Sequence, residues 1–348
     1  MLARNLLVAV AVFAPGIGGI PVPAAFGRDL TVVVHGASDS TAIQQVFVAP
    51  FTSATGIPVS VQSWNGTPDA LAAGLKQPSN WDLVQVGAGD LQTGCAAGTL
   101  EKLDWSQIGG KDHYLPQAAS DCGVGATLNN LVLAWNRDKF PGNPTWVDFW
   151  DVAKLPAKRG LHRDVVGNLE IALMADGVAP ADVYKTLATS EGVDRAFRKL
   201  DQLKPYIVWW DTDADAGKIL STGDVLMTSA PSPEIVRDTQ ASHRNFGIQW
   251  TDSLYDVLSW AIVKGTPNLR DAEQFLYFAG TPAIEGRLVE QFGLGGLAKG
   301  ANDALSSNLL AVSPTSPANL KSGLQIDTGF WHDNLAKLRQ RFDAWLAH

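Results

Sequence analysis

The sequence is short of positive charge and of long hydrophobic runs. It has 27 Lys and Arg residues against 35 Asp and Glu residues, which gives a formal net charge of −8 at pH 7. An acidic chain has no electrostatic attraction to nucleic acids or to anionic membranes. After the N-terminal segment, no hydrophobic stretch approaches the ~20 residues that a membrane-spanning helix needs. The composition therefore argues against nucleic-acid binding and against insertion in a membrane.

Signatures of catalysis and of metal binding are also missing from the sequence. There is no G-x-S-x-G, H-E-x-x-H or Walker A pattern. The six histidines are scattered, and no pair has the spacing of metal ligands on a helix. Gly87-Ala88-Gly89 lacks the third glycine of a dinucleotide-binding fingerprint. We therefore expect a protein that is not an enzyme and that has no cofactor and no metal site.

Cysteine is nearly absent, and the two that occur are Cys95 and Cys122. In an oxidising compartment, a minimal even count favours one disulfide. The alternative is two separate buried thiols, because free cysteine behaves as a small apolar residue. Nothing nearby supplies two further metal ligands at a workable spacing. The sequence predicts a structural Cys95–Cys122 disulfide.

The N-terminus has the layout of a secretory signal peptide. Residues 1–25 combine one early positive charge at Arg4, the apolar run Leu6–Ala14 and small residues before Phe26. The apolar run is too short to span a bilayer as a permanent anchor. No cysteine lies near the cleavage site, so lipid attachment there has no support. We predict export of the mature protein to the periplasm.

The length and the order of elements predict two α/β lobes. A chain of 348 residues exceeds what one hydrophobic core usually supports. Buried strands and helices alternate, which is typical of mostly parallel sheets with helices on their faces. The predicted strands are Leu30–Val34, Val59–Trp64, Trp81–Val86, Arg159–Arg163, Tyr206–Trp210 and Val225–Thr228. The predicted helices include Thr41–Thr55, Asp69–Leu75, Asn168–Asp176, Asp194–Lys204, Ala214–Thr222, Arg270–Phe278, Pro282–Phe292 and Trp331–Trp345.

Two further extended segments, Leu131–Asn136 and Ser259–Val263, lie between these sets and predict a hinge that links the lobes. In open parallel sheets, ligands bind outside the carboxyl ends of the strands. The strand-end loops of both lobes would then face one shared cleft. The predicted cleft loops are Gly36–Ser40, Trp64–Gly66, Gly87–Asp90, Thr127–Asn130, Arg163–Gly167, Trp210–Asp213 and Ser229–Ser232.

Several of these stretches together resemble one family. The chain is similar to bacterial extracellular solute-binding proteins of ABC importers, and in particular to the spermidine/putrescine-binding type. The stretches that carry the resemblance are Leu30–Gly36, Pro50–Val59, Trp81–Val84, Gly94–Asp104, Leu133–Phe140, Trp146–Asp151 and Ala261–Asn268. The resemblance implies a two-lobed periplasmic binding protein fold of type II that delivers its ligand to a membrane permease. The expected lobes are residues 26–133 plus 262–312 and residues 134–261 plus 313–348.

Polyamine-binding members of the family use acidic residues for the amino groups and aromatic rings for the methylene chain. By position, Asp164 matches one of these acids, and the second acid falls at Gly167. The aromatic first loop becomes Gly36–Asp39, and a further aromatic position falls near Ser229. The acid of the crossover segment falls near Leu258, with Asp256 close by. These departures predict a ligand that is shorter or less highly charged than spermidine.

The first lobe supplies three candidate ligand-binding residues. Ser38 and Asp39 follow the first strand, where each could cap the next helix and also contact a ligand. Trp64 ends the second strand just before Asn65-Gly66, so it either packs in the core or forms a wall of the cleft.

Arg163 and Asp164 are the most discriminating pair of candidates. In an extended stretch, adjacent side chains point to opposite faces, so only one of the two is expected in the cleft. Asp164 would favour a cationic group, whereas Arg163 would favour a carboxylate. The third interpretation is a surface ion pair of little energetic value. The family match favours Asp164.

The remaining candidates lie near other strand ends. Trp210 could stack on a ligand, while Asp213 either caps a helix or contacts the ligand. Ser229 lies near an aromatic ligand position of the family, and Tyr255 and Asp256 precede the second crossover. Several carboxylates around one cleft favour a cationic guest.

These observations predict a monomeric solute receptor that closes its two lobes on a small amine-containing metabolite. Closure would create the state that a permease of an ABC importer recognises. A carboxylate or zwitterionic ligand is an alternative because of Arg163. A sensory receptor subunit that passes the same closure to a signalling partner is another.

Overall fold

The computed structural model describes residues 28–36 and 40–348 of the chain. The predicted signal peptide, residues 1–25, and the candidates Ser38 and Asp39 lie outside the described residues. Across these described ranges, no helix is both long enough and apolar enough to cross a membrane.

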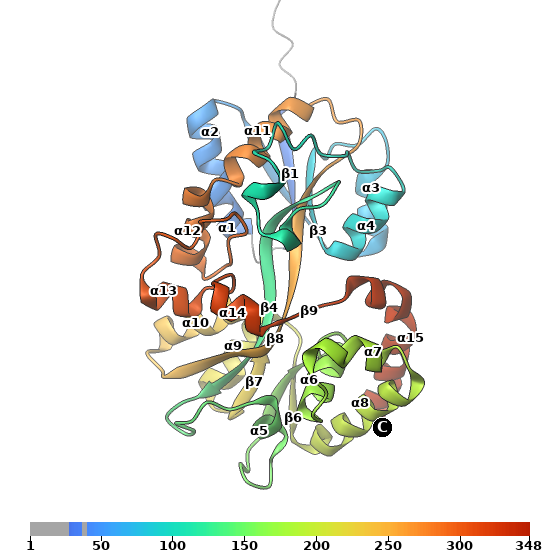
Figure 1. Cartoon of the computed structure of the whole chain (residues 1–348), viewed down its shortest axis with the longest axis vertical. Helices are drawn as coiled ribbons and strands as arrows, with labels where there is room; N and C mark the ends of the chain where they lie inside the picture. Colours follow the sequence, from blue (N-terminus) through green and yellow to red (C-terminus); the bar gives the residue numbers. More distant parts are fainter. Residues whose placement is uncertain (1–27, 37–39) are drawn as a thin grey trace, which may run out of the picture.

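The strands form one nine-stranded mixed sheet in the order β2-β1-β3-β8-β4-β7-β5-β6, with β9 paired to β8 (Figure 1). β1 is parallel to β2 and β3, and β5 is parallel to β6 and β7. β8 is antiparallel to β3 and β4, and β4 is antiparallel to β7. The bounds are β1 Leu30–His35, β2 Val59–Trp64, β3 Leu83–Val86, β4 Val124–Asn136, β5 Arg159–His162, β6 Ile207–Trp210, β7 Met227–Ala230, β8 Phe246–Ile262 and β9 Leu324–Gln325.

The two parallel sets are those that the sequence predicts, and we call the half with β1–β3 lobe 1 and the half with β5–β7 lobe 2. The predicted crossovers Leu131–Asn136 and Ser259–Val263 are parts of the much longer strands β4 and β8. Polar residues in the middle of both strands hide their extent in the sequence, because strand patterns are recognised by apolar residues.

β4 and β8 pair with each other between the lobes. β3 joins β8 at 259–262, and β7 joins β4 at 132–135. Between these positions, residues 127–131 of β4 pair with residues 254–258 of β8. We call this two-stranded segment the crossover ribbon.

In lobe 1, helices cover both faces of β1–β3 (Figure 1). One face packs against α1 Ser40–Ile43, η1 Gln44–Val48, α2 Ala49–Thr55, α11 Leu269–Ala279 and α12 Pro282–Phe292. The other face packs against α3 Pro68–Leu75 and α4 Ala88–Ala96. α1, η1 and α2 follow one another as the predicted helix Thr41–Thr55, and Gly56 ends it in the left-handed conformation at φ 75°.

In lobe 2, one face of the sheet packs against α6 Asn168–Ala175, α7 Val183–Leu187, α8 Ser190–Leu203 and the C-terminal α15 Thr328–Ala347, with α5 Trp146–Trp150 beside them. The other face packs against α9 Asp213–Thr222 and α10 Ser232–Ser242. Short 3₁₀ turns occur at η2 Lys111–His113, η3 Pro116–Ala118, η4 Pro180–Asp182 and η5 Lys204–Tyr206.

The chain returns to lobe 2 through α13 Ser307–Val312, α14 Pro317–Ser322 and β9. Between α13 and α14, Ser313, Thr315 and Ser316 are buried, and Asn302 Nδ2 donates to the carbonyl of Thr315 at 3.0 Å. β9 then runs parallel to β8 at the crossover ribbon. The exact lobe boundaries stay a prediction.

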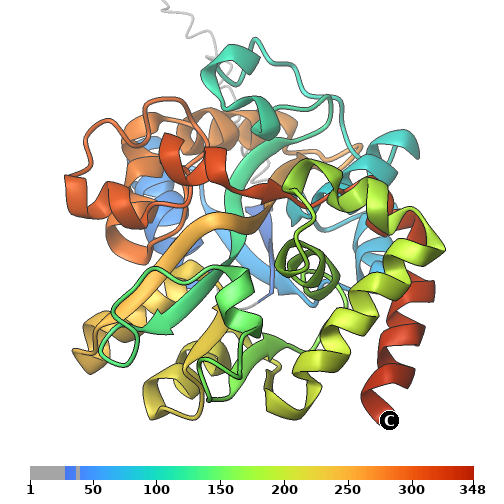
Figure 2. The same cartoon turned by 60° about the horizontal axis from the view of Figure 1, so that its bottom comes forward.

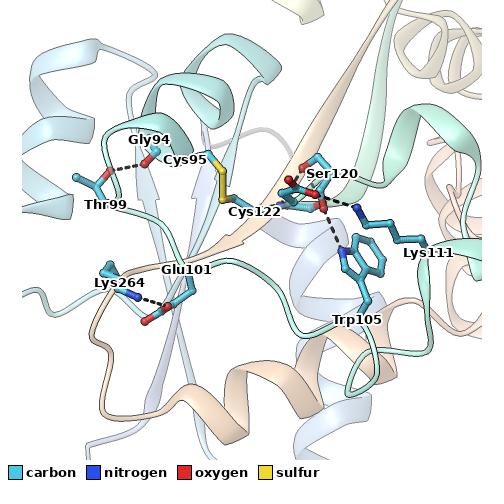
Figure 3. The surroundings of a disulfide bond; sticks show 11 residues. Gly94, Cys95, Thr99, Glu101, Trp105, Lys111, Ser120, Cys122 and Lys264 are labelled. Atoms are coloured by element: carbon cyan, nitrogen blue, oxygen red, sulfur yellow. Dashed lines mark hydrogen bonds and ion pairs between the residues drawn. A yellow bond between two sulfur atoms is a disulfide. The ribbon is translucent and has the colours of Figure 1, made fainter.

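The predicted disulfide Cys95–Cys122 is confirmed (Figure 3). Its Cα atoms are 5.7 Å apart, and it joins the end of α4 to the segment that leads into β4. Closing a loop of this length stabilises a fold by roughly 3–4 kcal/mol in the chain-entropy model. Trp105 Nε1 donates to the carbonyl of Ser120 at 3.1 Å and holds the same loop.

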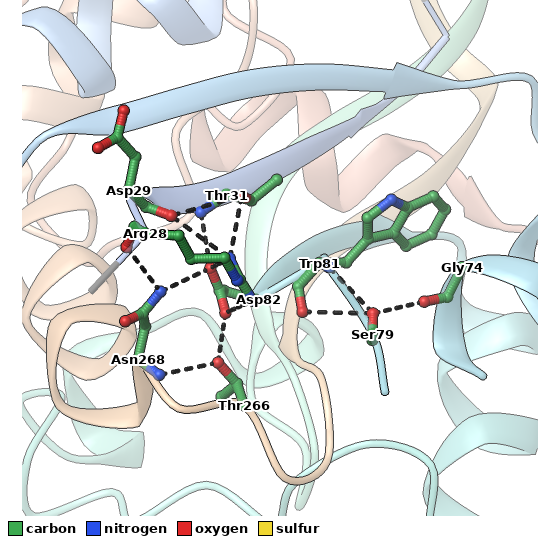
Figure 4. Close-up of polar contacts among 9 residues, drawn as sticks. All are labelled: Arg28, Asp29, Thr31, Gly74, Ser79, Trp81, Asp82, Thr266 and Asn268. Atoms are coloured by element: carbon green, nitrogen blue, oxygen red, sulfur yellow. Dashed lines mark hydrogen bonds and ion pairs between the residues drawn. The ribbon is translucent and has the colours of Figure 1, made fainter. Parts of the chain in front are cut away.

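A buried carboxylate ties the N-terminal strand to two distant segments (Figure 4). Asp82 is fully buried and accepts both guanidinium nitrogens of Arg28, at 2.5 and 2.7 Å. It also accepts the backbone N–H of Thr31 and the side chains of Thr266 and Asn268. Burial would raise the pKa of Asp82, but these hydrogen bonds outweigh it and lower the pKa.

We predict that Asp82→Asn lowers the free energy of unfolding by about 2–4 kcal/mol at neutral pH, because it removes several hydrogen bonds to a buried charge. The pKa of Asp82 is lower in the folded than in the unfolded chain, so this contribution is lost as the pH falls below about 4. Urea titrations of both proteins at pH 7 and at pH 3 measure this difference in the free energy of unfolding.

The matched control is Asp121→Asn, which breaks the exposed ion pair with Lys111. This change is expected to leave stability unaltered, since exposed ion pairs contribute little. Equal stability of Asp82→Asn and the unmodified protein at pH 7 would contradict the structural role of Asp82.

Candidate functional site

Loops from both lobes meet at the crossover ribbon. This agrees with the expectation that the loops at the carboxyl ends of the strands, which we call the strand-end rule, face one shared cleft. From lobe 1, Gly87 follows β3, and a Cβ on it would lie 3.9 Å from Asp256 Oδ2. From lobe 2, a Cβ on Gly167 would lie 3.1 Å from Leu131 and 3.5 Å from Leu254. Figure 2 shows β1 (blue) directed towards the green and yellow elements of lobe 2. The candidate site is the region between these loops.

Eight buried side-chain atoms have no hydrogen-bond partner within the described part of the chain, and they gather around this region. Buried polar groups are normally paired, so each such atom calls for a ligand, a water or another explanation. The atoms are Gln85 Nε2, Thr127 Oγ1, Asn130 Nδ2, Asn168 Oδ1, Trp210 Nε1, Ser229 Oγ, Ser232 Oγ and Trp260 Nε1. All belong to β3, β4, β6, β7 or β8, or to the first residues of α6 and α10.

The strand register places Asp256 on one face of the crossover ribbon together with several of these groups. Asn129 is directly opposite Asp256, and Thr127 is directly opposite Leu258. Directly opposite residues share a face of a sheet, as do residues two apart along a strand. The contacts of Gly87 and Gly167 show that loops of both lobes cover this face. We call it the cleft face.

Asp256 is the carboxylate of the cleft face. It is half-buried, and one of its oxygens accepts the N–H of Val257 at 2.7 Å. No cation pairs with it in the part of the chain that the structure describes. Burial raises the pKa of Asp256 to about 6. A carboxylate in this setting is stabilised by an incoming positive charge.

Arg163 and Asp164 each already have a partner, and the two partners lie on different elements. Arg163 Nε donates to Asp211 Oδ1 at 2.9 Å. Asp164 accepts Arg339 Nη2 of α15 at 2.9 Å and the N–H of Val166 at 3.2 Å. The two residues therefore hold the β5–α6 loop to α15 and to the β6–α9 loop.

Gly167 explains why the second acid of the polyamine-binding pattern is missing. Its φ of +86° lies in the region that residues with side chains avoid, and a Cβ would press against Leu131. Its N–H donates to the buried Glu170, which also accepts Trp331 Nε1 at 2.7 Å and Tyr184 OH at 2.9 Å. Any larger residue at this position would strain the loop.

Trp210 is buried, and its ring stacks on His162 with centroids 4.3 Å apart. Burial lowers the pKa of His162, although Asp164, Asp213 and Asp211 act in the opposite direction. Trp209 instead packs against Phe342 and Trp345 of α15. One face of Trp210 is thus already covered by an imidazole, and its indole N–H remains unpaired among the described residues.

Asp213 is the first residue of α9, and Glu234 lies in the first turn of α10. Burial raises the pKa of Asp213 despite His162 and Arg237. Burial also raises the pKa of Glu234, and the nearby Asp213 raises it further. Arg237, which pairs with Glu234 at 2.6 Å, acts in the opposite direction. Negative charge is therefore concentrated at the start of both helices.

His35, at the end of β1, lies beside Trp64 with ring centroids 5.0 Å apart. Trp64 is buried, and its Nε1 donates to the carbonyl of Gln85 at 2.9 Å. Burial raises the pKa of Asp90 on α4, while His35 and His332 lower it. His35 belongs to lobe 1 and His332 to α15 of lobe 2, so histidines of both lobes act on the carboxylate of Asp90.

Ser229 is fully buried in β7, and its hydroxyl has no partner among the described residues. Tyr255 lies opposite Asn130 and therefore on the other face of the ribbon from Asp256. At this other face, Asn130 Oδ1 accepts the N–H of Ser232 at 2.9 Å.

Among the sequence-predicted residues that the structure describes, only Asp256 combines an unpaired charge with the cleft face. The roles assigned to Trp64, Arg163, Asp164, Trp210, Asp213, Ser229 and Tyr255 in ligand binding stay predictions. Sequence reasoning did not single out Gln85, Thr127, Asn130, His162, Asn168, Ser232, Glu234 or Trp260. Thr127, Asn130 and Ser232 lie inside predicted cleft loops, and Gln85 is a polar residue within a buried apolar strand, so the sequence held a signal for these four.

Two cavities lie away from the cleft face. One, of about 620 Å³, lies between α10, α12 and α13. The other, also of about 620 Å³, is lined by Leu91, Val257 and Ser259. The latter two residues are on the opposite face of β8 from Asp256.

Comparison with known proteins gives a consistent result. The sequence model of the family described as bacterial extracellular solute-binding protein matches residues 47–314. The chain is 39% identical over 322 residues to a gamma-aminobutyric acid-binding protein of Pseudomonas aeruginosa, covering 92% of this chain and 91% of that protein. 

Solved structures agree with this result. An ABC transporter substrate-binding protein from Bradyrhizobium japonicum has a TM-score of 0.82 and 28% identity, covering 92% of this chain and all of that one. The GABA receptor Atu4243 has a TM-score of 0.80 and 25% identity, covering 92% of this chain and 98% of that one. The predicted type II periplasmic binding protein fold is confirmed.

We predict that Asp256→Asn raises the stability of the ligand-free protein at pH 8 by roughly 1–3 kcal/mol, because it removes a carboxylate whose pKa is raised by burial. The folded pKa of about 6 exceeds that of the unfolded chain. The destabilisation by Asp256 is therefore complete above pH 6 and disappears as the pH falls to about 4. Chemical denaturation of both proteins from pH 4 to pH 8 measures the difference, and a constant difference would contradict it.

Proposed function

The chain belongs to the bacterial extracellular solute-binding proteins, and we propose that it is the periplasmic substrate-binding component of an ABC importer for a small solute with a protonated amine. The observation that carries the amine assignment is Asp256. Its carboxylate is half-buried, lies where both lobes meet and has no cationic partner among the described residues.

The physical argument for the amine is electrostatic. Desolvation disfavours the charged form of Asp256, and a bound ammonium group would offset this cost. Asp164, which matches the polyamine-binding position, already pairs with Arg339. We therefore place the amine at Asp256 rather than at Asp164. The assignment to Asp164 remains an alternative that the titration below also tests.

The named ligand of the relatives supports this choice. The Pseudomonas relative and the structure of Atu4243 are both named for gamma-aminobutyric acid, which carries one amine. A single amine needs a single carboxylate partner in the protein. The loss of the second acid at Gly167 fits a solute of this kind better than a polyamine with several charges.

Ligand binding would be coupled to closure of the two lobes. Gly87 of lobe 1 and Gly167 of lobe 2 both approach the cleft face, so a solute held there touches both lobes. A ligand that contacts both lobes only in the closed state shifts the population towards that state. We propose that a permease recognises the closed monomer, with lobes near the boundaries that the sequence predicts.

We predict that Asp256→Asn weakens binding of 4-aminobutanoate by about 10- to 100-fold at pH 7.5, because a charge-assisted hydrogen bond contributes about 1.5–3 kcal/mol. Affinity of the unmodified protein should fall by about tenfold between pH 7 and pH 5, as Asp256 becomes protonated below its pKa of about 6. Isothermal titration calorimetry measures both effects.

Asp164→Asn is the matched control for this titration, since it removes a carboxylate that already has a cationic partner. The affinity of the Asp164→Asn protein for 4-aminobutanoate should stay within about twofold of that of the unmodified protein. If Asp164→Asn abolishes binding and Asp256→Asn does not, the amine lies at Asp164 and the present assignment is wrong.

We also predict that a saturating ligand reduces the radius of gyration in small-angle X-ray scattering, because the lobes close about the crossover ribbon. The Asp256→Asn protein at the same ligand concentration provides the control and should keep the larger radius. An unchanged scattering curve at confirmed saturation would contradict lobe closure.

A further inference from the structure

We propose that the solute carries a carboxylate in addition to its amine, and that Gln85, Thr127 and Trp260 bind this carboxylate. The inference rests on the amine site proposed at Asp256. It makes the substrate class an ω-amino carboxylate with a short methylene chain.

The three residues share the cleft face with Asp256. Gln85 is directly opposite Trp260 in the β3–β8 ladder, and Thr127 is directly opposite Leu258 in the β4–β8 ladder. Trp260, Leu258 and Asp256 alternate along β8 and therefore point to the same side. The three residues thus surround the end of the cleft face that lies towards lobe 1.

Each of the three presents a buried polar atom without a partner among the described residues. These atoms are Gln85 Nε2, Thr127 Oγ1 and Trp260 Nε1, and the side chains are at most 1% exposed. An amide nitrogen and an indole nitrogen can only donate, and a hydroxyl can donate as well. Three donors without acceptors among the described residues can be satisfied by a ligand group that supplies oxygen atoms with lone pairs. A carboxylate has two such oxygens and about four acceptor positions.

The surrounding contacts hold the donors in place. Gln85 Oε1 accepts the N–H of His35 at 3.1 Å, which leaves the amide nitrogen as the free end of this side chain. The Trp260 ring packs edge-on against Phe47 and Phe275, with centroids 6.5 and 5.9 Å away. The donors are thus fixed before the ligand arrives, which lowers the entropic cost of binding.

The pattern along β8 matches the order of groups in an ω-amino carboxylate. Residues two apart on a strand are separated by about 7 Å. Asp256 can bind the amine, the apolar and buried Leu258 lies next along the face, and the donor group follows at Trp260 and Gln85. The carboxylate, the apolar side chain and the donors of the protein are therefore arranged in the same order as the ammonium group, the methylene chain and the carboxylate of the ligand.

The test is a calorimetric comparison of three probes that differ by one group each. These are 4-aminobutanoate, butylamine, which lacks the carboxylate, and butanoate, which lacks the amine. The mature protein is expected to bind 4-aminobutanoate at least tenfold more tightly than either of the others. Thr127→Val removes one donor and preserves shape, whereas Trp260→Phe removes the indole N–H together with part of the buried ring. Each variant should lower the affinity for 4-aminobutanoate by about 5- to 10-fold and leave the affinity for butylamine unchanged.

Ser313→Ala is the control, because it also removes a buried hydroxyl, in the segment between α13 and α14. This hydroxyl donates to Asn302 Oδ1 at 2.8 Å and lies outside the cleft face, so the affinity for 4-aminobutanoate should not change. Thr127→Val should keep or raise the melting temperature of the ligand-free protein, which shows that a loss of affinity does not come from unfolding.

The outcomes separate the two proposals. Equal affinities for 4-aminobutanoate and butylamine, or equal weakening of both by Thr127→Val and Trp260→Phe, would overturn the carboxylate site and leave the amine site intact. Butanoate binding as tightly as 4-aminobutanoate, together with no effect of Asp256→Asn, would overturn the amine site. If neither amine binds, the amine site and the inference built on it both fail.

Discussion

The pairing of β4 with β8 is the constraint on which both lobes and the cleft depend. β3 extends the sheet from β8 on one side, and β7 extends it from β4 on the other. The same pairing decides which side chains face the ligand region, because a slip of one residue would turn Thr127 and Asp256 to the opposite face. Architecture and recognition therefore rest on one ladder of backbone hydrogen bonds. The two extensively packed cores, one in each lobe, keep this ladder in register.

This arrangement requires the protein to leave polar groups unpaired in its interior. A buried donor without an acceptor costs about 1–3 kcal/mol, and several lie around the crossover ribbon within the described residues. The disulfide and the Asp82 cluster stabilise lobe 1 away from the cleft, where they do not restrict the ligand. The cleft face, in contrast, keeps buried donors that a bound ligand can satisfy.

The fold was largely predictable from the sequence, because strands such as Leu30–His35 are continuous apolar runs and helices end at residues such as Gly56. The full lengths of β4 and β8 were not predictable. Their central parts contain Asn129, Asn130 and Asp256, which interrupt the apolar pattern by which strands are recognised. Under the proposed function, Asn129 and Asp256 interrupt the apolar pattern because they share the face on which the ligand would bind. Sequence patterns are least informative where function replaces apolar residues in a strand.

The same reasoning explains which site residues could be found. The strand-end rule located the loops, and the register within the ribbon then decided between neighbours such as Tyr255 and Asp256, which a sequence alone cannot do. Asp164 matches a ligand-binding position of the family, yet Arg339 on the distant α15 neutralises it. At Gly167 the backbone has a positive φ and lies against Leu131, so an acidic side chain would be strained there. A residue such as Asp164 can therefore occupy a family ligand-binding position and still make a structural contact there. With the loop acid paired and the second acid absent, the unpaired negative charge of the cleft face is at Asp256, on the strand that links the two lobes, so a ligand bound there acts directly on the element about which they close.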